Sequence, residues 1–322
     1  MKWEVSMIRR LLPAVVGLAV LAAVAPAHAQ GANNYRLMTG PQGGVWVPLG
    51  GALKNIWEKA IPGLSVQTLP GAGIANVRGV DEDRAEIGFG NSISTVDGVN
   101  GVDPFPRKAA NVCQMASLYP QYFQIVVNED SGINSVRDLK GKAIAVQTRG
   151  NTAEVITQHI LKTVGMSYTD MKVNFLPSYN DAVSLLKDGH AQAFTLGTTI
   201  PASSVMDLAT SRRIRVLDLK DSVDPMKKIN SGYVAVTLPA NTYPNQPAAV
   251  TKIGYAAHLI VSCKLPEDRV YTMMRAIQDN MRDLVAVNKA MDGITPAAMG
   301  EDIGVPFHPG AKKFYVERGV KM

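Results

Sequence analysis

The sequence predicts an α/β protein built from two lobes, and three observations carry this prediction. Segments typical of strands alternate along the chain with segments typical of helices, a pattern that favours helices packed on mostly parallel sheets. The chain has 322 residues, which is more than one ordinary domain usually holds. Two extended stretches, Val112–Asn128 and Ile253–Cys263, are longer than the typical strand of about 5–6 residues. Strands of that length are expected to cross from one lobe to the other.

The first 29 residues have the features of a secretory signal peptide. The basic residues Lys2, Arg9 and Arg10 precede an apolar run from Leu11 to Val24, and Ala27-His28-Ala29 supplies the small-residue cleavage pattern. The apolar run is shorter than the roughly 20 residues that a membrane-spanning helix needs. We therefore expect export and cleavage after Ala29, with an uncleaved anchor as the alternative.

Short segments rich in β-branched and aromatic residues, bounded by Gly, Pro or polar turns, are predicted to be strands. In chain order they are Tyr35–Met38, Leu64–Leu69, Glu86–Phe89, Ala143–Val146, Lys172–Leu176, Ala191–Thr195, Ile214–Leu217 and Tyr233–Thr237. Helices are predicted where apolar residues recur at helical spacing. These helical stripes run from Leu49 to Ala60, from Ile156 to Val164, over Asn180–Asp188 and, longest of all, from Val270 to Leu284.

The two long strands also set the predicted lobe boundaries. One lobe comprises residues 30–119 together with residues 260–322, and the other comprises residues 120–254. The long strands, at about residues 112–128 and 253–263, are the predicted hinge. Cys113 and Cys263 lie on these two strands, so they are expected to be near neighbours. We expect two buried thiols, because a bridge would restrain the hinge; a disulfide, which an oxidising compartment permits, is the alternative.

The composition excludes several classes of protein. Hydrophobic residues make up 46% of the chain and charged residues 19%, which is unlike a disordered chain. Aromatic residues are only 6% and the basic residues are scattered, so no nucleic-acid partner is expected. Part of the formal charge of +6 comes from the predicted signal peptide, and the remainder is too mild to indicate a partner.

Enzyme motifs are missing from the sequence. It contains no P-loop, no G-x-S-x-G and no H-E-x-x-H, and Gly71-Ala72-Gly73 begins a dinucleotide-like pattern that fails at its third glycine. The histidines after the signal peptide are far apart, and no Cys/His spacing indicates zinc. We therefore expect a protein that is not an enzyme, with no catalytic residue, no metal site and no cofactor.

A first glycine-rich loop, Thr39–Trp46, has the pattern of a ligand cradle. It follows a predicted strand and opens a predicted helix. Its glycines let the backbone approach a ligand closely, and the free N–H groups of a helix start favour an anion such as a carboxylate. An ordinary strand-to-helix turn is the alternative. The candidate ligand-binding residues of this loop are Thr39, Gly40, Gln42, Gly43, Gly44, Val45 and Trp46.

A second loop, Gln147–Glu154, also joins a predicted strand to a predicted helix, and it adds hydroxyl groups and a guanidinium. Arg149 is expected to bind a carboxylate through two parallel hydrogen bonds. The alternative is that Arg149 is an ordinary exposed arginine on the surface. The candidate residues here are Thr148, Arg149, Gly150, Asn151 and Thr152.

Two further loops follow the predicted strands Glu86–Phe89 and Ala191–Thr195 and offer short polar side chains. Open α/β sheets place ligands at such carboxyl ends of strands. The candidate residues are Asn91 and Ser92 in one loop and Thr198 and Thr199 in the other, although each loop could equally be a simple turn. Together the four loops predict a clamp between two lobes for a small organic acid or amino acid.

At these loops and in several other places the sequence resembles a known family, the TAXI group of solute receptors of tripartite ATP-independent periplasmic (TRAP) transporters. The resemblance covers essentially the whole chain after the signal peptide. Six motifs carry it in order: Thr39–Gly44 followed by Pro48–Leu53, Ser117–Pro120 with Tyr122–Gln124, Asp138–Lys142, Thr242–Gln246, Leu265–Asp268 and Phe307–Ala311.

The resemblance implies a two-lobed type II periplasmic binding protein fold with a ligand cleft between the lobes. It also implies a periplasmic receptor, expected to be a monomer, that binds a small carboxylate ligand such as glutamate and delivers it to ion-coupled TRAP membrane subunits. A receptor for an ATP-driven transporter, or a ligand-binding module of a sensor system, is the alternative.

Overall fold

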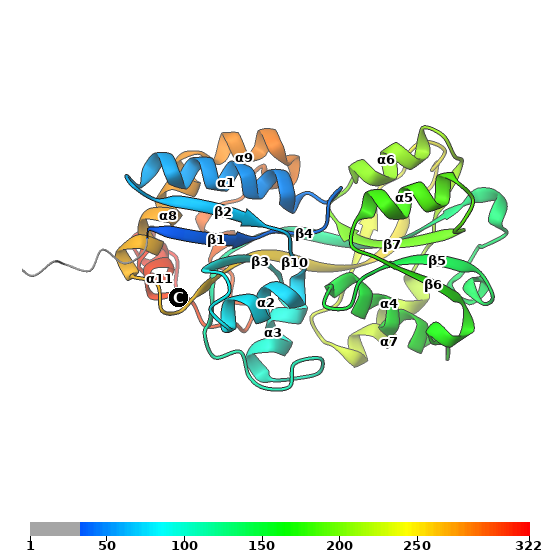
Figure 1. Cartoon of the computed structure of the whole chain (residues 1–322), viewed down its shortest axis with the longest axis horizontal. Helices are drawn as coiled ribbons and strands as arrows, with labels where there is room; N and C mark the ends of the chain where they lie inside the picture. Colours follow the sequence, from blue (N-terminus) through cyan, green and yellow to red (C-terminus); the bar gives the residue numbers. More distant parts are fainter. Residues whose placement is uncertain (1–32) are drawn as a thin grey trace, which may run out of the picture. The chain divides into compact units, whose positions relative to one another are not determined.

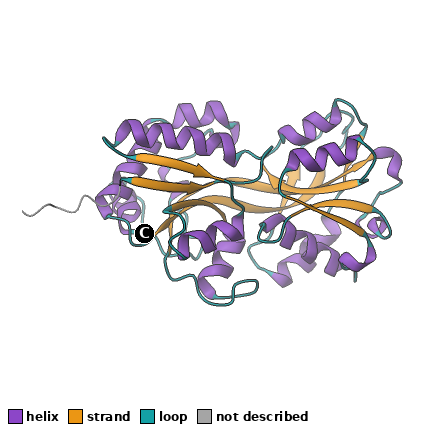
Figure 2. Cartoon of the chain, in the orientation of Figure 1, coloured by secondary structure: helices purple, strands orange, loops and turns teal. Residues whose placement is uncertain are grey.

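Helices cover both faces of a mixed β-sheet in the computed structural model, which describes residues 33–322 (Figure 1). Figure 2 shows the same layering by secondary structure. The predicted signal peptide and its cleavage site lie outside the described residues. The predicted α/β class is confirmed.

The strands of the described chain are β1 (Asn34–Met38), β2 (Ser65–Leu69), β3 (Ile87–Asn91), β4 (Val112–Asn128), β5 (Ala143–Gln147), β6 (Lys172–Leu176), β7 (Ala193–Thr198), β8 (Ile214–Val216), β9 (Val234–Leu238) and β10 (Val250–Ser262). The strands β4 and β6 have the bounds that the sequence predicts. The predicted strand at residues 253–263 begins three residues earlier, at Val250.

The helices are α1 (Trp46–Ala60), α2 (Gly73–Asp81), α3 (Ser92–Asn100), α4 (Thr152–Thr163), α5 (Tyr179–Lys187), α6 (Ser203–Ala209), α7 (Lys220–Ile229), α8 (Glu267–Asp279), α9 (Met281–Val287), α10 (Pro296–Met299) and α11 (Pro309–Val316). Short 3₁₀ turns lie at Glu129–Ser131, Val136–Leu139, Tyr168–Asp170 and Lys289–Met291. The predicted long helix from Val270 to Leu284 is divided at Asn280, where the backbone leaves the helical conformation. None of the described helices is long and apolar enough to cross a membrane.

The strands follow the order β2-β1-β3-β10-β4-β7-β5-β6, with β8 paired to β4 and β9 paired to β10. Pairing is parallel around β1 and around β5, whereas β4 and β10 are antiparallel to each other and to their other partners. The expectation of a mostly parallel sheet is therefore wrong at its centre. The reason is that β4 and β10 carry the chain in opposite directions between the two halves.

The hydrophobic core falls into two groups of clusters that the long strands connect. One group packs α1, α8, α9 and α11 on one face of β1–β3 and α2 on the other. The other group packs α4 and α7, and α5 and α6, on the two faces of β5–β8. We call the part of the chain built around the first group lobe 1 and the part built around the second group lobe 2 (Figure 1). Along β4 the core changes from lobe 1 at Tyr119 to lobe 2 at Phe123, and along β10 it changes between Tyr255 and Ala257.

Cys113 and Cys263 form a disulfide, with their Cα atoms 5.2 Å apart. The preferred expectation of two free thiols is therefore wrong. Cys113 is the second residue of β4 and pairs with Val261 of β10, and Cys263 directly follows the end of β10. Both residues pack in the core of lobe 1, away from the place where the strands cross. The bridge therefore ties strand ends within one lobe and leaves the crossing unrestrained.

Candidate functional site

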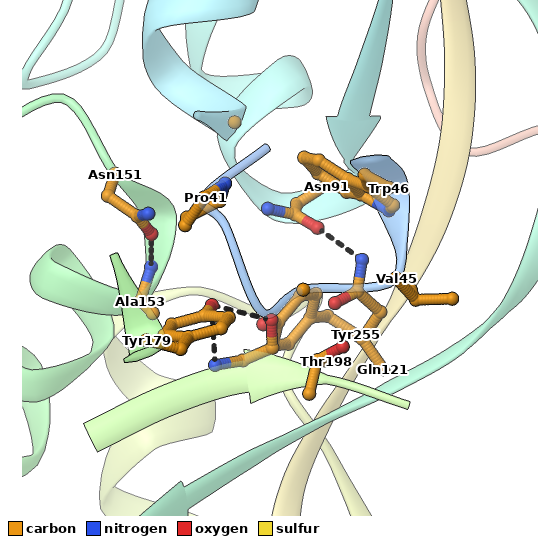
Figure 3. A pocket seen from close by; sticks show the side chains of 13 residues that line it. Pro41, Val45, Trp46, Asn91, Gln121, Asn151, Ala153, Tyr179, Thr198 and Tyr255 are labelled. Atoms are coloured by element: carbon orange, nitrogen blue, oxygen red, sulfur yellow. Dashed lines mark hydrogen bonds between the residues drawn. The ribbon is translucent and has the colours of Figure 1, made fainter. Parts of the chain in front are cut away.

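A small pocket lies where the two lobes meet, and both lobes supply its walls (Figure 3). Its volume is about 20 Å³, which is room for roughly one water molecule. A ligand larger than water therefore needs the walls to move apart. The lining residues are Pro41, Gly44, Val45, Trp46, Gly73, Asn91, Gln121, Asn151, Ala153, Tyr179, Gly197, Thr198 and Tyr255.

Five helices begin at this pocket. In each case the first residue or the residue just before it lines the pocket: Trp46 for α1, Gly73 for α2, Asn91 for α3, Asn151 for α4 and Tyr179 for α5. A helix start presents unpaired N–H groups and the positive end of the helix dipole. The convergence of five such ends gives the pocket a positive potential, although every lining side chain is neutral.

Local sequence explains why these helices start where they do. Asn151 caps α4 by accepting a hydrogen bond from Ala153 N at 2.8 Å, and Ser178 caps α5 in the same way through Asn180 N at 3.0 Å. In the first loop Gly43 adopts φ +79°, a conformation that favours glycine, and Gly44 N closes a turn on Pro41 O at 3.1 Å. This turn brings Gly44 and Val45 to the pocket wall.

Three aromatic side chains form the rigid walls. Trp46 stacks on Phe89 with ring centroids 5.3 Å apart. The Tyr179 hydroxyl donates to Gly197 O at 3.1 Å, and burial raises the pKa of Tyr179 to about 12. Burial also raises the pKa of Tyr255, whose hydroxyl lies so close to Gly197 that a side chain there would overlap it. Both phenols are therefore neutral at physiological pH.

Gln121 stands at the centre of the crossing on β4, and its side chain joins both lobes. Its amide is 3.1 Å from the Asn91 amide. With the amide turned so that its NH₂ group faces lobe 2, it donates to Gly197 O at 3.1 Å and its oxygen accepts from Trp46 Nε1 at 3.3 Å. Gln121 is buried, so these neutral partners satisfy a side chain that would otherwise be costly to bury.

Hydrogen bonds between the lobes surround the pocket. Tyr179 N donates to Gln42 O at 3.0 Å, and Ala75 N donates to Gly150 O at 3.0 Å. The hydroxyls of Ser94 and Thr152 lie 2.9 Å apart. Each of these bonds joins a residue of lobe 1 to a residue of lobe 2, and together they hold the pocket shut.

Asn230 makes a further contact between the lobes, donating to both carboxylate oxygens of Asp97 at 3.1 and 3.2 Å. Burial is the main reason that the pKa of Asp97 is raised to about 6.

The structure places the predicted ligand residues in three environments. The first group lines the pocket and comprises Gly44, Val45, Trp46, Asn91, Asn151 and Thr198. These residues come from all four predicted loops, so the structure brings the loops together around one pocket.

A second group supports the pocket without lining it. Thr39 is buried and its hydroxyl donates to Leu69 O at 2.9 Å, while Gly40 lies against the Trp46 ring. Gln42 and Gly150 supply the carbonyl groups of the bonds between the lobes, and Thr152 supplies a hydroxyl.

The remaining members of this second group have similar roles. Gly43 O accepts from Ser203 Oγ at 3.3 Å, and Ser92 Oγ accepts from Ala256 N at 3.0 Å. Thr199 is buried and lines a neighbouring cavity of about 350 Å³.

Thr148 and Arg149 form the third group, because both side chains are exposed. The Arg149 guanidinium lies 3.6 Å from Glu154 Oε1 and 5.5 Å from the centre of the Phe175 ring. It lines a separate cavity with Asp103 and His159 and does not line the pocket of Figure 3. In this structure the Arg149 guanidinium, which was expected to bind a carboxylate, is therefore directed away from the pocket.

Sequence reasoning missed seven lining residues: Pro41, Gly73, Gln121, Ala153, Tyr179, Gly197 and Tyr255. Gln121 carried a signal, because it is a polar residue within the long apolar strand β4. Gly73 also carried one, since a glycine that opens a helix after a strand marks a close approach. Tyr179 and Tyr255 carried none, because apolar spacing does not tell which side of an element faces a second lobe.

Among residues 33–322, no group of His, Cys, Asp or Glu side chains is arranged to hold a metal ion.

Comparison with known proteins identifies the fold and the family. The structure resembles a periplasmic transporter at 14% identity over 90% of this chain and 93% of the other, with a TM-score of 0.52. It also resembles PhnD1 from Prochlorococcus marinus in complex with methylphosphonate, at 13% identity over 80% of this chain and 91% of the other, with a TM-score of 0.51. An ancestral arginine-binding protein bound to arginine is similar at 13% identity over 81% and 99% of the two chains, with a TM-score of 0.50.

Identities this low establish the fold alone, which is the expected two-lobed periplasmic binding protein fold. The family follows from the sequence itself, because the model of the NMT1-like family matches residues 37–319. This chain therefore belongs to the NMT1-like family.

Proposed function

We propose that this protein is a periplasmic receptor that captures a small organic acid or amino acid between its two lobes. The observation that supports the proposal most is the convergence of five helix starts on one pocket whose side chains are all neutral. Such a pocket attracts a carboxylate through backbone N–H groups and helix dipoles, without a cationic side chain. The fold and the family are those expected of a binding protein, and no enzymatic activity is proposed.

Binding is proposed to close the lobes about β4 and β10. The pocket is too small for an organic acid as it stands, and hydrogen bonds between the lobes hold it shut. A ligand must therefore enter while the lobes are apart and be enclosed when they approach. Small-angle scattering is expected to show a smaller radius of gyration with ligand than without it, and an unchanged radius at saturation would contradict closure.

A thermal-shift screen of carboxylates and amino acids on the purified protein tests the receptor role. A ligand present at 100 times its Kd adds about 2.7 kcal/mol to the free energy of unfolding. At least one small carboxylate is expected to raise the melting temperature, with calorimetry to confirm one site per chain. Absence of any shift across carboxylates and amino acids would contradict the proposal.

The membrane partner is proposed to be a pair of ion-coupled TRAP subunits, as the resemblance to TAXI receptors implies. An ATP-driven transporter or a sensor is the alternative. Membrane vesicles that contain candidate transport subunits, assayed together with this receptor, distinguish the candidates. Receptor-dependent uptake driven by an ion gradient supports the TRAP partner, whereas uptake that needs internal ATP supports the alternative transporter, and no uptake with either source favours a sensor.

Export is proposed to remove residues 1–29 and leave Gln30 as the first residue. The intact mass of the protein from the periplasmic fraction is expected to match the chain that begins at Gln30. A full-length, membrane-bound product would contradict this.

A further inference from the structure

The polar groups that line the pocket suit an anion and are unfavourable for an ammonium group. The lining side chains with polar atoms are Trp46, Asn91, Gln121, Asn151, Tyr179, Thr198 and Tyr255, and each is an uncharged amide, hydroxyl or indole (Figure 3). Some oxygen atoms of the lining residues already accept a hydrogen bond. The Asn151 oxygen accepts from Ala153 N, and Gly197 O accepts from the Tyr179 hydroxyl.

An ammonium group in this place would face two penalties. Burial without a carboxylate partner is costly for a charged amine. In addition, five helix starts direct their positive ends to the pocket, and a cation near a helix start is disfavoured. A carboxylate gains from the same five ends, so the two charges of an amino acid have opposite preferences here.

The acidic side chain nearest to the second loop does not relieve these penalties. Glu154 accepts from Gln158 Nε2 at 2.7 Å and lies 3.6 Å from the Arg149 guanidinium. It lines the separate cavity that contains Arg149 and His159 and does not line the pocket of Figure 3.

We propose that the ligand is a small organic acid without an ammonium group, such as a hydroxy or oxo acid, and that amino acids are discriminated against. This rests on the proposed receptor function and restricts its substrate class. The hydroxyl or carbonyl group of such an acid is neutral, and it can exchange hydrogen bonds with the amide and phenol groups of Gln121 and Tyr255.

Calorimetry with matched pairs tests the proposal on the wild-type protein. The pairs are malate and aspartate, 2-hydroxyglutarate and glutamate, and lactate and alanine, in which the members differ by a hydroxyl in place of an ammonium group. In every pair that binds, the hydroxy acid is expected to bind at least tenfold more tightly.

An amino acid that binds as tightly as its partner, or more tightly, would overturn the inference and leave the receptor role intact. No binding in any pair would overturn both the inference and the proposed class of small acids, even if another solute binds.

Two variants test the cause of the discrimination. Gln121→Glu places a carboxylate at the pocket without changing the size of the side chain. It is therefore expected to weaken hydroxy-acid binding at least tenfold and to reduce the ratio of hydroxy-acid affinity to amino-acid affinity. Gln67→Glu makes the same change on the exposed edge strand β2 and is expected to change neither value. A preference unchanged by Gln121→Glu in a folded variant would overturn the electrostatic cause. Asn91→Asp is the second pocket variant if Gln121→Glu does not fold.

Discussion

Gly73 is the position at which a single methyl group tests closure of the lobes. It begins α2 in lobe 1 and faces Thr152, which begins α4 in lobe 2. A Cβ atom on Gly73 would overlap the Thr152 hydroxyl and lie 2.6 Å from Asn91 Nδ2. The Asn91 amide is the end of a side chain in the same lobe and can move, whereas Thr152 is held by its 2.9 Å contact with Ser94 Oγ. Gly73→Ala is therefore expected to hold the lobes apart.

The cost of this substitution follows from overpacking and from the contact that it breaks. An added methyl group in a well-packed site costs about 1–3 kcal/mol. If the cost falls on the closed, ligand-bound state alone, the Kd rises about 5- to 150-fold. Loss of the hydrogen bond between Ser94 and Thr152 adds about 0.5–1.5 kcal/mol to the cost. The ligand-free melting temperature is expected to change little. When the lobes are apart, as proposed for the ligand-free protein, the added methyl group does not contact Thr152 of the other lobe.

Calorimetry with the best acid from the screen measures the effect, and two further variants isolate its cause. Gly51→Ala adds the same methyl group on α1, where it meets open space, so it is expected to leave the Kd unchanged. Thr152→Ala combined with Gly73→Ala removes the overlap and is expected to recover most of the affinity. Wild-type affinity in Gly73→Ala would refute closure at this contact. Failure of Thr152→Ala to rescue would show that the methyl group meets the ligand and leaves closure unaffected.

Three other changes are expected to have measurable effects. Burial raises the pKa of Asp97 from its ordinary 3.8 to about 6, so the folded protein holds this proton over a pH range in which an exposed carboxyl releases it. The resulting stabilisation of the folded state is complete below about pH 4 and is lost as the pH rises through about 6. The free energy of unfolding of the wild type is therefore expected to fall relative to that of Asp97→Asn between about pH 4 and pH 6, and parallel profiles of unfolding free energy against pH would contradict this. Replacement of both Cys113 and Cys263 by Ser opens a bridge between residues 150 positions apart and is expected to lower the free energy of unfolding by about 2–5 kcal/mol, with ligand affinity unchanged. Two titratable thiols in the denatured, unreduced wild-type protein would contradict the bridge itself. Because the Arg149 side chain is 69% exposed, Arg149→Ala is expected to weaken binding less than threefold. A loss of affinity above tenfold would show that the guanidinium contacts the ligand.

The sequence predicts the strands of this fold better than its helices, because local patterns determine most of the strands, whereas α2, α3, α6, α7, α10 and α11 are not predicted. The strands β4 and β6 match their predicted bounds, and β4 is long enough to indicate a chain that passes between two cores. The predicted parallel pairing fails at β4 and β10, in pairs that mostly join distant segments. No local pattern tells that β10 lies between β3 and β4 with the opposite direction, since this arrangement depends on segments more than 100 residues apart.

The pocket is harder to predict than the fold, because it depends on the directions of side chains at the junction of the lobes. The pocket residues Gly44, Val45 and Trp46 could be predicted, because a glycine-rich loop that opens a helix is recognisable in the sequence. Arg149 shows the limit of such reasoning. Its long side chain has the right charge and loop, but in this structure the guanidinium lies beside Phe175 and Glu154 and does not line the pocket.

Tyr179 shows the opposite limit, because in the sequence it only precedes the predicted helix Asn180–Asp188. It becomes a wall of the pocket only when the lobes meet.

Closure uses some of the backbone donors at the helix starts and leaves others for the proposed anion. Tyr179 N and Ala75 N belong to helix starts, and each donates to a loop carbonyl of the opposite lobe. The N–H groups of Trp46 and Gly73, the first residues of α1 and α2, lie at the pocket and have no carbonyl acceptor in the described chain. Each bond between the lobes replaces a bond to water and contributes only about 0.5–1.5 kcal/mol. A carboxylate bound here, as proposed, would accept from these two donors of lobe 1, which closure alone leaves unpaired. The proposed ligand shifts the equilibrium toward the closed state only by the amount of its differential affinity for that state.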